Sequence, residues 1–260
     1  MLLDKSRALL LLGQIAMRHP RFADIRSIAA ALCRVTGATL GYLPEGANAA
    51  GAALAGVLPH RGPGGQPLEN PGLNAGAMLA APRRVYVLFG FEPEHDLSDA
   101  LLAQDALGAA DKVICFTSYL SDALEGVADI LLPVATFAET AGTYVNVEGT
   151  WQSVGAAADT VGEAREGWRV LRVLGNHLGL PGCEYRSAAD IREELIGALA
   201  YYRASTAYDG GFVPPCAPAD CDEAALDVPI YSVDPIVRRG LALQQTATAR
   251  ETAPTVTDAR

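Results

Sequence analysis

Residues 85–134 read VYVLFGFEPEHDLSDALLAQDALGAADKVICFTSYLSDALEGVADILLPV, and the pattern of this stretch decides the fold class. Its short apolar runs lie at 85–90, 113–117 and 130–134. A helical segment at 99–107 separates the first two runs, and a short helical turn around 121–124 separates the last two. Nearly continuous apolar strands are typical of parallel sheets that helices cover on both faces. The stretch therefore predicts an α/β fold.

The same alternation extends upstream to the start of the sequence. Apolar strands are predicted at 7–13 and 39–43, and helices at 22–35, from Asn48 to Val57, and at 73–80. Gly37 is expected to cap the first of these helices, whereas the loop 59–72 is too rich in Pro and Gly for a regular element to cross it. Strand–helix alternation of this kind predicts a doubly wound, mostly parallel sheet over residues 1–135.

The sequence changes character after residue 135. Residues 136–154 are polar, punctuated by Gly and rich in Thr, Val and Tyr, which predicts an irregular loop-and-hairpin segment. Helices are predicted at 168–178 and 188–202. We therefore expect a second part at 136–205, and then an extended carboxyl-terminal tail at 206–260 whose last ten or so residues are disordered.

Composition excludes several classes of protein. The 260 residues carry 20 Lys and Arg against 30 Asp and Glu, for a net charge of −10, which argues against nucleic acid as a partner. Apolar runs such as Ala8–Leu12 are far shorter than the roughly 20 residues of a spanning helix, so no direct membrane insertion is expected. The five Cys include no C-x-x-C pair, and Cys216 and Cys221 are read as unrelated thiols and not as metal ligands. Scattered Cys favour a reducing, cytoplasmic compartment.

One loop holds the residue types of a ligand site. It reads FEPEHD and follows the strand 85–90, at the end of a parallel strand where α/β proteins usually bind ligands. Glu92, Glu94, His95 and Asp96 offer oxygen and imidazole ligands for a divalent metal. The alternative is that these acidic residues gather at the positive end of the following helix, with Asp96 or Ser98 as its cap, and we favour this alternative.

Other polar residues near the ends of strands and in helices are interpreted mainly as structural. Thr117 and Ser118 end another strand, where they are turn residues or anion contacts. His177 lies in the helix 168–178 and is expected to pack or cap. No catalytic motif of the common nucleotide-binding, metalloprotease or hydrolase types occurs.

The segment 128–152 carries a resemblance to a known family. Its stretches ADILLP (128–133) and ETAGTYVNVEGTWQ (139–152) resemble the signature of the molybdopterin oxidoreductase superfamily. In detail the sequence is similar to the carboxyl-terminal part of the G subunit of bacterial NADH–quinone oxidoreductase (respiratory complex I), its large iron–sulfur subunit. Further matching stretches are LPEGANAAGA (43–52), LFGFEPEHD (88–96), GEAREGWRVLRVLGNHLGL (162–180) and PIYSVDPIVRRGLALQQTA (229–247).

The resemblance implies a fold kept without its cofactor. Pterin-using relatives carry Asn-Pro where this sequence has Glu92-Pro93, and an acidic side chain disfavours a pyrophosphate-bearing pterin. The iron–sulfur clusters are expected in an amino-terminal part of the longer subunit, and no cofactor, metal or catalytic residue is expected here. The signature residues are therefore read as structural: Asp129, Pro133, Glu139, Gly142, Thr143, Asn146, Glu148, Gly149 and Gln152.

The resemblance supports one functional hypothesis over two others. The first is a non-catalytic structural portion of the respiratory enzyme, bound to the other subunits of its hydrophilic arm at the cytoplasmic side of the bacterial inner membrane. The second is a molybdopterin-dependent oxidoreductase, or a remnant of one. The third is a free-standing small-molecule binder, which rests on fold class alone.

Overall fold

A computed structural model of the chain describes residues 7–19, 21–97, 99–203 and 231–251. Its contacts divide the chain into two compact units. The first comprises Met1–Ala49, Val147–Gly149 and Arg203–Arg260, and the second comprises Ala50–Asn146 and Thr150–Tyr202. The ranges 1–135, 136–205 and 206–260 drawn from the sequence stay predictions.

The first unit contains a small parallel sheet covered by a helix. Strands β1 (Leu9–Leu12) and β2 (Thr39–Tyr42) pair in parallel, with Leu10 opposite Leu40. Helix α2 (Phe22–Thr36) buries its apolar side against them. The core residues are Leu12, Ala29, Ala30, Cys33 and Leu40. Both strands and the helix were predicted from the sequence.

Gly37 ends α2 in the predicted way. Its φ of +72° is in the left-handed region that glycine adopts without the penalty of a Cβ, so the chain can turn back into β2. A short helix that the sequence did not predict, α1 (Gln14–Arg18), precedes α2.

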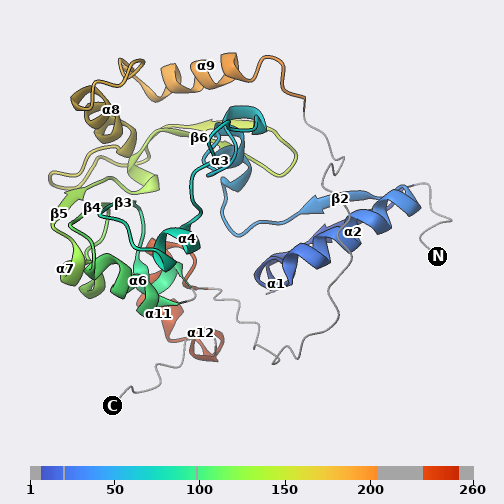
Figure 1. Ribbon diagram of the computed structural model, residues 1–260, viewed down its shortest axis with the longest axis horizontal. Coiled ribbons are helices and arrows are strands. Elements are labelled where there is room, and N and C mark those ends of the chain that lie inside the picture. The colour runs from blue at the N-terminus through green and yellow to red at the C-terminus, as the bar shows by residue number, and fades with distance from the viewer. Residues whose placement is uncertain (1–6, 20, 98, 204–230, 252–260) are drawn as a thin grey trace. The chain divides into compact units, whose positions relative to one another are not determined.

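The second unit contains the sheet that the opening stretch predicts (Figure 1). Strands β3 (Val85–Phe89), β4 (Lys112–Thr117) and β5 (Ile130–Pro133) are all parallel, in the order β3-β4-β5. The intervening helices are α6 (Ala100–Gly108) and α7 (Asp122–Val127), and α4 (Ala75–Ala80) precedes β3. The predicted α/β fold with parallel strands is confirmed, although the described strands form separate sheets in the two units.

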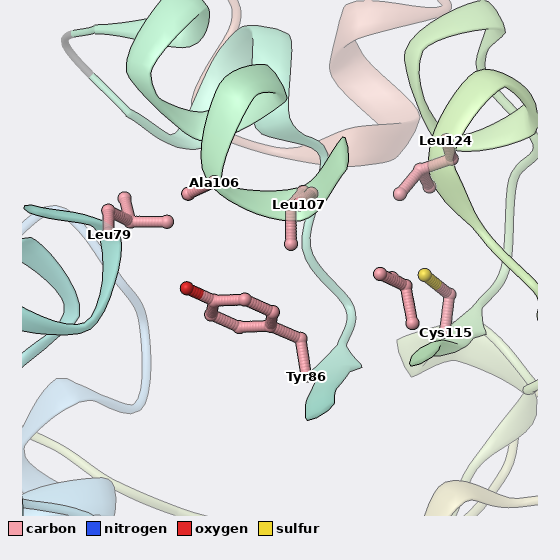
Figure 2. Packing of buried hydrophobic residues seen from close by; sticks show 7 residues of the cluster. Leu79, Tyr86, Ala106, Leu107, Cys115 and Leu124 are labelled. Carbon is pink, nitrogen blue, oxygen red and sulfur yellow. The ribbon is translucent and has the colours of Figure 1, made fainter. Parts of the chain in front are cut away.

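One face of this sheet forms the core of the second unit. Figure 2 shows Tyr86 and Cys115 of the sheet pointing toward Leu107 of α6 and Leu124 of α7. Leu107 and Leu124 are fully buried. The ring of Tyr86 packs among apolar side chains while its hydroxyl donates to the carbonyl oxygen of Met78 at 2.7 Å. The polar atom of this core residue is therefore satisfied, as a buried hydroxyl must be.

The opposite face of the sheet is apolar and only partly covered in the described chain. Its exposed side chains, all between 37% and 53% accessible, are Val85, Val87, Phe89, Ile130 and Leu132. Helix α8 (Gly167–His177) lies on this side (Figure 1), and Gly167 leaves room for the Phe89 ring, with which a Cβ would collide at 2.5 Å. Phe89 also contacts the buried ring of Phe116, with centroids 5.9 Å apart.

A hairpin and two helices follow the sheet, as predicted. Strands β6 (Gly142–Val145) and β7 (Trp151–Val154) pair in antiparallel fashion after a 3₁₀ turn at Phe137–Glu139. Helices α8 and α9 (Ala188–Ala198) correspond to the helices expected at 168–178 and 188–202.

The Pro- and Gly-rich loop is more ordered than its composition suggests. After α3 (Ala49–Ala55), which begins directly after Asn48, it contains a 3₁₀ turn at Pro63–Gly65. Gly56 has a φ of +82°, and a Cβ there would lie 2.5 Å from the carbonyl carbon of Gly62. The close backbone approach requires glycine at this position.

Three sequence-based details were wrong. The cap of α6 is Asp99, whose carboxylate accepts the N–H of Leu102 at 2.9 Å, and not Asp96; Ser98 lies outside the described residues. The loop FEPEHD contains a one-turn helix, α5 (Pro93–Asp96). Residues 231–251, expected to be extended, contain the short helices α10 (Pro235–Arg238), α11 (Leu241–Gln244) and α12 (Ala247–Glu251).

The reason for the last difference is local. Asp234 accepts the N–H groups of Ile236 and Val237, and Pro235 is the first residue of α10, so a cap and a preset φ start a helix that has no long apolar period. The rest of the predicted tail, including Cys216 and Cys221, lies outside the described residues. Among the described residues, no helix combines the length and the apolar character needed to cross a bilayer.

Candidate functional site

The loop after β3 brings the strongest group of ligand atoms together. Gly90 ends the strand with its N–H donating to the carbonyl oxygen of Phe116 at 2.8 Å and with a φ of +60°. Pro93 then starts α5 and is fully buried, which anchors the turn in the second unit. The one-turn helix therefore places its side chains at the carboxyl end of β3, where ligands bind in parallel α/β folds.

Three of the four residues singled out in this loop converge. One ligand atom each from Glu92, Glu94 and His95 lies within 4.8 Å of the others. Glu92 is buried, at 2% exposure, and His95 is exposed. Atom Oε2 of Glu94 is also buried and has no hydrogen-bond partner. Two carboxylates and one imidazole therefore lie close together, with one carboxylate buried and the imidazole exposed.

The fourth residue, Asp96, has a different position. Its Oδ2 accepts the backbone N–H of Glu92 at 2.8 Å, and the N–H of Asp96 donates to the carbonyl oxygen of Glu92 at 2.9 Å. These bonds close the turn around Pro93. Asp96 thus positions the loop and is not part of the converging group.

The signature residue Glu139 stabilises a backbone turn. Its Oε2 accepts the N–H of Thr136 at 2.8 Å and the hydroxyl of Thr136 at 3.0 Å, and its Oε1 accepts the N–H of Val161 at 3.2 Å. The backbone N–H of Thr136, followed by its hydroxyl, lowers the pKa of the Glu139 carboxyl below its ordinary value. The side chain therefore joins the segment before the hairpin to the segment before α8.

Asn146 and Gly149 form the turn of the hairpin. The N–H of Thr150 donates to Oδ1 of Asn146 at 2.9 Å, and the N–H of Asn146 donates to the carbonyl oxygen of Thr150 at 3.1 Å. Gly149 has a φ of +83°, which a β-carbon would strain. These two residues fix where the chain reverses.

The remaining signature residues lie along strands or at the exposed tip. Thr143 of β6 contacts the hydroxyl of Ser153 in β7 at 3.1 Å, directly across the register. Pro133 ends β5 opposite Thr117. Glu148 and Gln152 are exposed, and Gly142 starts β6. The signature thus lies along the hairpin and the strand before it, and does not form one cluster.

Glu166 is a structural residue that the sequence reasoning missed. Burial raises its pKa, but hydrogen bonds from Arg169 and from the N–H of Ala141 outweigh this effect, so the pKa is lowered overall. Glu166 precedes α8 and ties it to the start of the hairpin. Its only sequence signal was the i,i+3 spacing to Arg169, which is common on helix surfaces.

The remaining candidates are a turn residue, an exposed histidine and two buried thiols. The hydroxyl of Thr117 donates to the carbonyl oxygen of Tyr119 at 2.7 Å and accepts its N–H at 3.2 Å, which makes Thr117 a turn residue. His177 is exposed in the last turn of α8. Cys33 and Cys115 are buried free thiols in different units, and burial raises the pKa of Cys115.

Comparison with known proteins assigns the family. A protein-family model for molybdopterin oxidoreductases matches residues 1–177, about two thirds of the chain. The chain therefore belongs to the molybdopterin oxidoreductase family, which relates it to oxidoreductases. A search of curated proteins finds no match.

The family name implies a molybdopterin cofactor, but the residues at the end of β3 do not fit one. A pterin of this type carries a pyrophosphate, and residues 90–97 offer it three carboxyl side chains and no Lys or Arg. The Glu92 carboxyl is also buried, where repulsion between like charges is screened least. The side chains of this loop therefore disfavour a bound pyrophosphate.

Proposed function

We propose that the chain is a non-catalytic structural portion of the large iron–sulfur subunit of NADH–quinone oxidoreductase. The whole enzyme passes electrons from NADH to quinone, and this portion supports its hydrophilic arm. The proposal rests on the family match and on the stretches quoted above, which resemble that subunit from residue 43 to residue 247. In this setting the chain is peripheral to the cytoplasmic side of the bacterial inner membrane, held there by its partner subunits.

The observation that carries the proposal is the buried Glu92 together with signature residues that bond to the chain's own backbone. Glu92 occupies the position at which pterin-using relatives carry Asn, and its carboxyl is buried. Glu139 and Asn146 accept hydrogen bonds from the chain's own backbone. Signature residues that stabilise the chain's own backbone support a structural role for this portion. In this proposal the redox centres lie in an amino-terminal part of the subunit.

The proposal is tested by affinity purification of the tagged full chain from a cell that makes the respiratory enzyme. We expect the other hydrophilic-arm subunits to co-purify in fixed ratio. Leu124→Asp is the matched control, because a carboxylate at this fully buried position unfolds the second unit and should abolish specific recovery. A well-folded wild-type chain recovered alone, or equal recovery by both chains, overturns the proposal.

The second candidate is a pterin-dependent oxidoreductase, favoured by the family match over residues 1–177. It predicts molybdenum or tungsten bound in stoichiometric amount to protein made in a host that synthesises the pterin. Elemental analysis by mass spectrometry decides between the two candidates. We expect neither metal above background, and one atom per chain would make the second candidate correct.

A further inference from the structure

We draw no further inference here: the strongest candidate, the half-exposed apolar face of the β3-β4-β5 sheet around Val85, Val87 and Phe89, carries no proposal because nothing in the described part of the chain shows what covers it.

Discussion

Asp129 and Val113 are joined by a reciprocal pair of hydrogen bonds. The N–H of Asp129 donates to the carbonyl oxygen of Val113 at 2.9 Å, and the N–H of Val113 donates to Oδ2 of Asp129 at 2.8 Å. The other carboxylate oxygen accepts the ammonium of Lys112 at 2.7 Å. A side chain thus continues the ladder of backbone bonds past the beginning of β5 and fixes the register of β4 and β5.

The first prediction concerns this pair. Asp129→Ala leaves the N–H of the buried Val113 without its acceptor and should lower the free energy of unfolding clearly. Asp129→Asn keeps an oxygen for Val113 and should cost less. Lys112→Met removes only an exposed ion pair and should cost least. Urea unfolding measures all three, and a different order would contradict the role assigned to Asp129.

The second prediction concerns acid. Hydrogen bonds lower the pKa of Asp129, Glu139 and Asp190 in the folded chain, so the unfolded chain binds more protons in acid. Their stabilising contribution is present above the ordinary carboxyl pKa of about 4 and is lost as the pH falls through the lowered values. The urea midpoint should therefore drop below about pH 5. Glu139→Gln should make this drop shallower, and parallel profiles for the two proteins would be inconsistent with the bonds from Thr136.

The third prediction uses two glycines in helices. A Cβ at Gly175 of α8 would collide with Sγ of Cys183, whereas a Cβ at Gly197 of α9 meets nothing within 4 Å. Gly175→Ala should destabilise the chain. Gly197→Ala should stabilise it by up to about 1 kcal/mol, because alanine favours helix over the unfolded chain. Cys183→Ala should rescue Gly175→Ala, and its failure to do so would mean that the two residues do not pack together.

The fourth prediction concerns the core of the second unit. Leu124 is fully buried between α7 and the sheet, and Leu124→Ala should cost about 2 to 5 kcal/mol through lost contacts and the cavity left behind. Leu101 of α6 is 72% exposed, so Leu101→Ala should change stability by less than about 0.5 kcal/mol. Equal effects in thermal unfolding would place Leu124 outside the core.

The elements that the sequence predicts well are those with a strong local pattern. Strands β3, β4 and β5 are short runs in which β-branched, aromatic and leucine residues predominate, and such runs are typical of a parallel sheet. Helix α2 has an apolar period over 15 residues and ends at a glycine in the left-handed conformation. The apolar period, the length and the terminal glycine of this helix all indicate the same element.

The elements that were missed are short and depend on single contacts. Helices α1, α5 and α10 have four or five residues, too few to show a helical period. Asp99 caps α6 and Asp96 does not, because the chain turns after Pro93 and uses Asp96 to close that turn. The spacing of apolar residues does not predict where this turn falls. The four candidate ligand residues were identified from residue type, but the separation of Asp96 from the other three and the burial of Glu94 Oε2 are three-dimensional facts.

The half-exposed face of the β3-β4-β5 sheet has a practical consequence for handling the purified chain. Val85, Val87, Phe89, Ile130 and Leu132 present contiguous aliphatic and aromatic surface to solvent. Surface of this kind promotes self-association as concentration rises, even in a protein with a net charge of −10. Dilute samples or a fused solubility tag are therefore the conditions under which this chain should be prepared.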